Sequence, residues 1–325
     1  MQLAVLAVDG AFDTGLSVLL DTFGFANELA PQAGCPDLRF DVRLVGTRSH
    51  IQTGRGMRLS PDKVTRSSRR PDYVLVPATS AKTPEALAEI QCRRDVTDAH
   101  AVLQAWAERG TTVCAACTGT FTAAAAQVLD GHRATTAWWL SAAFRERFPR
   151  VRLDESKMVV DDGPVVTAGA AFGHADLALW LIRTHSPALS SLVARYLLVD
   201  DRPSQVVFAV PDHLHHNDPI VERFERWVRE NLEGPLSIEA GARAIGTSPR
   251  SLERRMREVM GRSPIAFVRD LRVEVAVHRL RTTDESLAEI AAAVGYQDAT
   301  TLRRLIRAKL GKGVVELRQR SDAAH

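Results

Sequence analysis

Short apolar runs alternate with amphipathic stretches over the first part of the chain. The apolar runs that predict strands cover residues 3–8, 40–45, 73–76 and 112–116. Between them, residues 16–29 and 98–109 repeat their apolar positions with the spacing of a helix. Runs of four to eight apolar residues are typical of strands covered on both faces. This order of elements predicts an α/β domain with a parallel, doubly covered sheet.

The pattern changes in two steps towards the C-terminus. Residues 157–167 alternate around Asp161-Asp162-Gly163, which predicts a hairpin, and a helix is expected over about 175–184. We therefore place one domain at residues 1–187. Residues 188–217 are expected to be a linker that contains one more helix, and residues 218–325 a second domain.

Only helices are expected in the second domain. Asp218-Pro219 has the residues of a helix N-cap and first turn, and Gly234-Pro235 ends that helix. Ser263-Pro264 begins a long helix, expected over 265–280. The fold class predicted for the whole chain is thus an α/β domain followed by an all-α domain.

Two helix-turn-helix patterns lie about 50 residues apart in this all-α domain, at residues 236–256 and 286–304. In each, a short apolar helix stops at a glycine, and a new helix starts after Ser248 or Asp298. Such a pair is typical of a protein that reads two successive major grooves of double-stranded DNA.

The start of each second helix supplies the candidate DNA contacts. In both helices the apolar positions face the core, so the remaining positions form an exposed stripe. Arginine can pair with guanine, and glutamate can accept a hydrogen bond from the cytosine amino group. The predicted DNA-binding residues are Arg250, Glu253 and Arg254 in the first unit and Ala299, Thr300, Arg303 and Arg304 in the second.

On these residues the C-terminal segment resembles the AraC/XylS-type DNA-binding domain, in which one long helix joins two helix-turn-helix units. The resemblance implies a transcription regulator that binds promoter DNA and contacts RNA polymerase, and it favours an activator. Arg254→Ala in the first unit and Arg304→Ala in the second are expected to weaken binding to promoter DNA.

Composition supports this reading. From His216 onward the chain carries 20 Lys and Arg against 16 Asp and Glu, a net charge of +4, whereas the first 215 residues have a net charge of −1. The cations of the C-terminal part are mostly arginine, which suits bidentate contacts to phosphate and guanine. No apolar run approaches the roughly 20 residues of a membrane span, and the N-terminus lacks a signal-peptide pattern. A cytoplasmic protein with no membrane partner is expected.

The cysteines and histidines give little sign of a metal site. Cys114 and Cys117 form a C-x-x-C pair, but Cys114 falls within an expected buried strand, and no second pair completes a zinc site. A His-x-His-His cluster at residues 213–216 is interpreted as a solvated turn. We expect neither a metal nor a cofactor.

Residues 112–121 read as a strand, a glycine-containing turn and an alanine-rich helix, the pattern of a nucleophile elbow. An elbow exposes its side chain at a helix N-terminus, where the helix dipole lowers the pKa of a thiol. Cys117 is the residue at this position.

With the sequence Ala134-Thr135-Thr136-Ala137-Trp138, the first domain resembles the PfpI, or class I glutamine amidotransferase-like, family, which implies a flavodoxin-like fold. The whole chain resembles the GlxA-type regulators, which join such a domain to an AraC-type one. In the family a histidine precedes this tryptophan and acts as the base, and here Ala137 stands in its place. The family's acidic partner is also absent, with Gly15 at its position and Asp13 nearby.

The expected function is therefore not enzymatic. We predict that the first domain mediates homodimerisation and holds a small-molecule effector in a pocket formed by Gly15, Cys117, Thr118, Ala137 and His174. Two alternatives use Cys117 as the reactive group: a thiol hydrolase, and a redox sensor whose oxidation changes DNA affinity.

Overall fold

The structure is a computed structural model that describes residues 1–155, 157–199, 205, 218–234, 236–260, 262–310, 313–315 and 317–318. It separates into two compact units, Met1–Gln205 and Val206–His325, and each is described by itself. The predicted histidine cluster at residues 213–216 lies outside the described residues.

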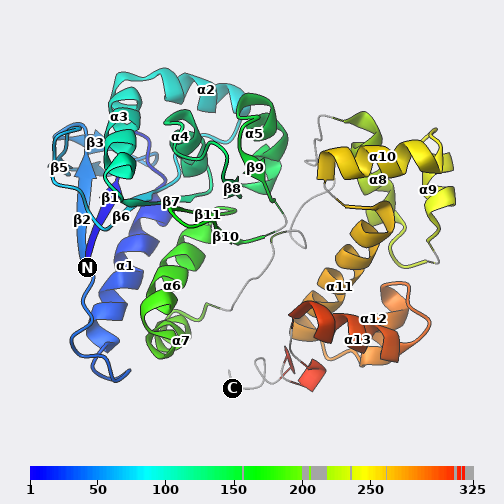
Figure 1. The fold of residues 1–325 in the computed structure, drawn as a ribbon. Coiled ribbons are helices and arrows are strands. Elements are labelled where there is room, and N and C mark those ends of the chain that lie inside the picture. Colours follow the sequence, from blue (N-terminus) through cyan, green and yellow to red (C-terminus); the bar gives the residue numbers. More distant parts are fainter. Residues whose placement is uncertain are drawn as a thin grey trace. The chain divides into compact units, whose positions relative to one another are not determined.

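The first unit is an α/β domain (Figure 1). Its strands are β1 (Gln2–Leu6), β2 (Asp41–Gly46), β3 (Ile51–Gln52), β4 (Arg58–Leu59), β5 (Asp62–Lys63), β6 (Tyr73–Val76), β7 (Thr112–Ala116), β8 (Arg133–Ala134), β9 (Arg152–Leu153), β10 (Val159–Asp161) and β11 (Val165–Ala168). Its helices are α1 (Asp13–Leu29), α2 (Pro84–Cys92), α3 (Arg94–Glu108), α4 (Gly119–Ala125), α5 (Ser141–Arg147), α6 (Gly173–His185), α7 (Pro187–Tyr196) and the 3₁₀ helix η1 (Trp138–Leu140).

Seven strands form the main sheet in the order β10-β11-β7-β6-β1-β2-β5. All neighbours pair in parallel except β10, which forms the predicted hairpin with β11. Taken in chain order, the five central strands have the order 2-1-3-4-5, which is that of flavodoxin. The predicted flavodoxin-like sheet is thereby confirmed.

Alternate residues of the strands pack on opposite faces of the sheet. Val74 and Val76 of β6 face the core beneath α2 to α5, whereas Leu75 between them faces α1, α6 and α7. Figure 1 shows these two groups of helices on either side of the sheet. Because both faces are covered, β6 is apolar at every position, and this is why it reads as a continuous run in the sequence.

The second unit is helical, as predicted. Its helices are α8 (Pro219–Glu230), α9 (Ile238–Ala244), α10 (Pro249–Met260), α11 (Pro264–Thr282), α12 (Leu287–Ala293) and α13 (Ala299–Leu310). The N-terminal half of α11 packs with α8, α9 and α10 around Phe224, Met256 and Phe267. Its C-terminal half packs with α12 and α13 around Leu280 and Ile306. One long helix thus belongs to two small cores.

Candidate DNA-reading surface and candidate ligand site

The first helix-turn-helix unit consists of α9 and α10. Gly246, with φ of +73°, makes the turn between them, a backbone conformation that glycine adopts without strain. The Ser248 hydroxyl accepts a hydrogen bond from the Ser251 N–H at 3.1 Å and so caps α10. Leu252 and Met256 are fully buried against the core, which fixes the side of α10 that remains exposed.

The exposed side of α10 carries the predicted contacts. Arg250 and Arg254 are exposed, and Glu253 is half-buried. The Glu253 carboxylate accepts from Arg257 Nε at 2.8 Å, one helical turn further on. This ion pair holds Glu253 in place and brings Arg257 to the same stripe.

The second unit consists of α12 and α13. Ser286 and Glu289 form the predicted capping box at the start of α12, and Gly295, with φ of +77°, makes the turn. Asp298 caps α13 by accepting from the N–H groups of Thr300 at 2.8 Å and Thr301 at 3.1 Å. These hydrogen bonds lower the pKa of Asp298.

Thr300, Arg303 and Arg304 are exposed along α13, whereas Ala299 is half-buried and packs against the core of the second unit. In the described part of the chain, Arg250, Arg303 and Arg304 form no ion pair. Their charge is available to a polyanion. Each recognition helix therefore presents unpaired arginine on its exposed stripe.

Arg272 of α11 connects the two helix-turn-helix units, a role that no local sequence pattern indicates. Its Nη2 donates to the carbonyl of Gly234 at 2.6 Å, just before α9, and its guanidinium lies 5.4 Å from the centre of the Tyr296 ring, just after α12. A Cβ on Gly295, where φ is +77°, would lie 2.8 Å from the Gly234 carbonyl oxygen, so this position requires glycine. Burial lowers the pKa of Arg272, and Tyr296 opposes this shift.

In the first unit, Cys117 lies between β7 and α4 with φ of +54°, a strained conformation for a residue other than glycine. A Cβ on Gly119 would lie 2.3 Å from the Val76 carbonyl oxygen, so α4 can begin this close to β6 only with glycine there. This is the geometry of a nucleophile elbow, as the sequence pattern indicates.

The prediction of an exposed thiol with a lowered pKa at Cys117 is wrong. The side chain is only 4% exposed, and burial raises its pKa to about 12, opposed in part by a hydrogen bond from the Thr118 N–H. The position of Cys117 just before α4 does not offset the loss of water. The thiol is held in its neutral form.

His174 is buried at the start of α6 and is held by two hydrogen bonds. Its Nε2 accepts from the Ala78 N–H at 3.0 Å, so its Nδ1 is protonated and donates to the Ala171 carbonyl at 2.7 Å. Burial lowers the pKa of His174 to about 4. Gly15 lies against this ring, because a Cβ there would be 2.5 Å from Nε2. A ring with both nitrogens occupied cannot take a proton from a thiol.

The other predicted pocket residues surround the elbow. Thr118 Oγ1 accepts from the Thr79 N–H at 2.8 Å and donates to the Thr79 carbonyl at 3.0 Å. Ala137 is fully buried in the same apolar core as Cys117. Because Thr79 follows Ala78, the structure links His174, Gly15 and Thr118 through one loop after β6. That loop lies where the strand order reverses, between β1 and β6, the usual place for a ligand in this fold.

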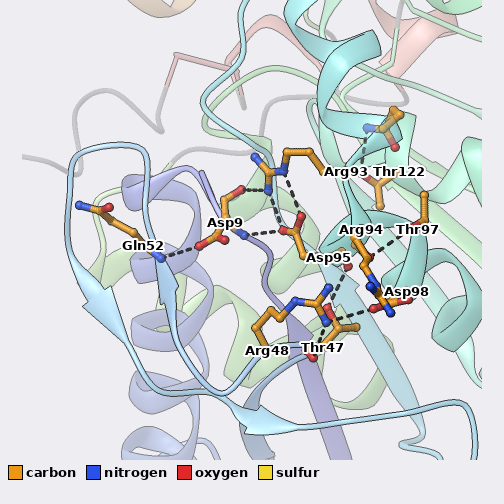
Figure 2. A network of polar contacts seen from close by, with 11 residues as sticks. Asp9, Thr47, Arg48, Gln52, Arg93, Arg94, Asp95, Thr97, Asp98 and Thr122 are labelled. Atoms are coloured by element: carbon orange, nitrogen blue, oxygen red, sulfur yellow. Dashed lines mark hydrogen bonds and ion pairs between the residues drawn. The ribbon is translucent and has the colours of Figure 1, made fainter.

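A polar network holds the loops at this end of the sheet (Figure 2). Arg93 makes two hydrogen bonds to the Asp95 carboxylate, at 3.0 and 2.6 Å, and one to the Asp9 carbonyl at 2.7 Å. The Asp95 carboxylate also accepts from the Asp9 N–H, and the Asp9 carboxylate accepts from the Gln52 N–H. Burial would raise the pKa of Asp95, but Arg93 outweighs it and the pKa is lowered.

Asp13 and Gln205, whose contacts no sequence pattern indicates, also hold parts of the first unit in place. Asp13, at the start of α1, accepts from the Thr53 hydroxyl and from the Arg55 N–H, and so holds the loop after β3. Gln205 is fully buried near Thr136. Neither belongs to a recognisable motif. In the described residues no group of three or more His, Cys, Asp or Glu side chains could hold a metal ion, and no helix is long and apolar enough to cross a membrane.

Comparison with known proteins agrees with both units. The DJ-1/PfpI family matches residues 1–184, so the chain belongs to this family, and a helix-turn-helix domain matches residues 242–320. An HTH-type transcriptional regulator GbdR of Pseudomonas aeruginosa is 28% identical over 261 residues, 79% of this chain and 68% of that protein. The HTH-type transcriptional regulator GlxA of Rhizobium meliloti is 26% identical over 234 residues, which cover 70% of this chain and 72% of that protein.

A solved protein of Vibrio parahaemolyticus shares the fold, with a TM-score of 0.50, 18% identity, and coverage of 61% of this chain and 98% of that one. The class is thereby defined: a DJ-1/PfpI-type α/β domain followed by a helical domain with two helix-turn-helix units. The resemblance to GlxA-type regulators predicted from the sequence is confirmed.

Proposed function

We propose that this protein is a sequence-specific DNA-binding transcriptional regulator, cytoplasmic and without enzymatic activity. One observation carries the proposal: two capped recognition helices, α10 and α13, expose unpaired arginines on a unit stabilised by one shared helix. The relatives GbdR and GlxA, both named as transcriptional regulators, support it.

In the proposed complex, α10 and α13 enter adjacent major grooves about 34 Å apart on one face of the duplex. The base-reading residues are Arg250, Glu253 and Arg254 of α10 and, on α13, Thr300, Arg303 and Arg304, with Ala299 beside them. The protein binds as a homodimer through its first unit and acts on RNA polymerase as an activator.

The first unit, in this proposal, is a sensor. Its effector is a small molecule bound near Gly15, Cys117, Thr118, Ala137 and His174, at the carboxyl ends of the strands where the strand order reverses. The neutral thiol of Cys117 and the doubly bonded His174 argue against the thiol hydrolase and the redox sensor. A thermal-shift screen with amines, amino acids and nucleotides is the way to find the effector.

Binding-site mapping across the genome followed by gel shift with the recovered promoter fragment tests the DNA-reading residues. We expect Arg254→Ala and Arg304→Ala each to weaken binding by about 1–3 kcal/mol, which is roughly 5- to 150-fold. Arg69→Ala removes the same charge from an exposed position of the first unit and should leave affinity unchanged. If both recognition-helix variants bound as tightly as the parent, these assignments would be wrong.

A further inference from the structure

Gln205 is the last residue of the first unit, and its side chain is fully buried. The amide nitrogen, Nε2, lies 2.9 Å from the Thr136 carbonyl, 3.1 Å from Thr135 Oγ1 and 3.5 Å from the Lys157 carbonyl. Its amide oxygen, Oε1, has no hydrogen-bond partner within the described residues. A long polar side chain is thus inserted into the domain with its nitrogen satisfied and its oxygen unsatisfied.

The backbone is shaped to admit this side chain. A Cβ on Gly169 would lie 2.4 Å from Gln205 Nε2 and 2.6 Å from its Cδ and Oε1. Any other residue at position 169 would fill the space that the amide occupies. Gly169 directly follows β11, so the amide lies at the same end of the sheet as the elbow.

The three surrounding oxygens select a hydrogen-bond donor. Two are backbone carbonyls, which only accept, and the Thr135 hydroxyl donates to the Lys157 carbonyl at 3.1 Å and so accepts from Nε2. The amide cannot be reversed, because its oxygen would then face two carbonyl oxygens. A carboxylate is excluded for the same reason. An ammonium group would be buried without a counter-ion in any of these contacts, so a neutral NH₂ group fits best.

This acceptor site is connected to the elbow. Thr136 Oγ1 lies 2.9 Å from the Cys117 carbonyl oxygen, and the Thr135 N–H donates to Thr167 Oγ1 of β11 at 2.7 Å. Hydrogen bonds therefore connect the site to the Cys117 carbonyl and to strand β11.

We propose that Thr135, Thr136, Lys157 and Gly169 form a binding site for a primary amide, which Gln205 fills as an intramolecular ligand. A small molecule with a primary amide competes for the site and releases Gln205, the residue after which the chain continues into the DNA-binding unit. The inference rests on the proposed function and deepens it, because it names the chemistry of the effector and the contact through which it acts.

Limited proteolysis of the full-length protein with chymotrypsin, followed at Phe208 three residues after Gln205, measures whether the chain is freed at Gln205. We expect Gln205→Ala and Gln205→Glu to raise the cleavage rate at Phe208 at least about fivefold, since each loses the hydrogen bonds of a buried amide. Gln297→Ala, at an exposed position of the second unit, is the matched control. Unchanged cleavage in both Gln205 variants, with circular dichroism showing a folded protein, overturns the proposal.

A second measurement tests the ligand class. In the Gln205→Ala protein the site is open, and saturation-transfer NMR should detect propionamide but not N,N-dimethylpropionamide, which lacks N–H donors. The parent should bind propionamide far more weakly, because the tethered side chain competes at a high effective concentration. Equal signals from the two amides, or no signal from either, refute an amide site.

These two readouts contain no DNA, so they stand or fall independently of the proposed function. Loss of the cleavage difference, with promoter binding intact, would refute the inference alone. Absence of promoter binding by the parent, with the cleavage difference intact, would refute the regulator instead.

Discussion

At Cys117, burial and a helix N-terminus act on the thiol pKa in opposite directions. The elbow places the residue where a long, solvated helix would stabilise a thiolate, but the side chain is 4% exposed and α4 is short. Burial wins and raises the pKa to about 12. The elbow is retained as backbone geometry, and the acidity that makes an elbow cysteine reactive is absent.

This balance predicts selective alkylation. With iodoacetamide at pH 8 under native conditions, the exposed Cys92 should react first, whereas Cys117 and the fully buried Cys114 should stay unmodified until the protein unfolds. Peptide mass spectrometry over a time course measures each site. Modification of Cys117 as fast as that of Cys92 would contradict a buried neutral thiol and revive the redox-sensor alternative.

His174 gives a pH dependence of stability whose sign follows from its lowered pKa. The folded pKa of about 4 lies below the ordinary value of 6.5, so the unfolded chain binds this proton first as the pH falls. The stabilisation by neutral His174 is therefore fully present above pH 6.5. It is lost progressively between pH 6.5 and 4, by about 3 kcal/mol in total.

Urea unfolding at several pH values, followed by tryptophan fluorescence, tests this expectation; four of the five tryptophans lie in the first unit. His174→Gln keeps one donor and one acceptor but does not titrate, so its free energy of unfolding should fall less than that of the parent between pH 7 and 4.5. His50→Gln, at an exposed position, should behave as the parent does. Parallel pH curves for His174→Gln and the parent would show that the buried ring is not responsible.

Helix boundaries in the second unit follow from local chemistry. Ser248, Ser286 and Asp298 each accept from backbone N–H groups at the start of the next helix, and such caps contribute about 1 kcal/mol each. Local signals of this kind predict the helix-turn-helix units from the sequence, because a cap and a turn glycine act within a few residues. The placement of the two helix-turn-helix units relative to each other cannot be predicted in this way, because Arg272 contacts groups about 40 positions before it and 24 after it.

Arg272 is expected to set the spacing of the two recognition helices. Arg272→Met fills a similar volume but leaves the Gly234 carbonyl without its donor, and should lower the free energy of unfolding of the second unit by about 1–3 kcal/mol. On DNA, one extra base pair between the two segments that α10 and α13 contact moves these segments about 3.4 Å further apart and rotates one relative to the other by about 34°. The parent should lose at least about tenfold in affinity for such a site, and Arg272→Met clearly less.

Gel shift with the original site and with the site one base pair longer gives, for each protein, the ratio of the two affinities. Arg269→Met, on the exposed side of the same helix α11, removes the same charge and should keep the parent's ratio. If Arg272→Met and the parent lost the same factor of affinity on the longer site, apolar packing around α11, and not Arg272, would set the spacing of the two recognition helices.

For the whole molecule, charge is divided between the units. The chain from His216 onward has a net charge of +4 and the first 215 residues −1, so the protein should meet DNA through its second unit. Because each neutralised phosphate releases counter-ions, the logarithm of the binding constant should fall linearly with that of the salt concentration, with a slope of about −0.9 per phosphate contact.

Removing one phosphate contact should thus reduce the slope by about 1. Arg303→Ala, which removes a proposed base-reading residue, should instead change the slope by less than this and lose sequence preference; a full reduction with unchanged preference would place Arg303 on the DNA backbone. Fluorescence anisotropy between 50 and 300 mM salt distinguishes the two. A slope that no arginine substitution on α10 or α13 alters would place the DNA surface elsewhere on the protein.

The sequence by itself determined the elements and the architecture, because apolar period, caps and turn glycines are local and repeated. It also places alanine at position 137, where the resemblance to the PfpI family implies a histidine. Only the tertiary structure decided that Cys117 is neutral, that His174 is occupied at both nitrogens, and that Gln205 and Arg272 bind groups far from them in the chain. Solvent exclusion and long-range hydrogen bonds depend on what packs around a side chain, and no local pattern records that.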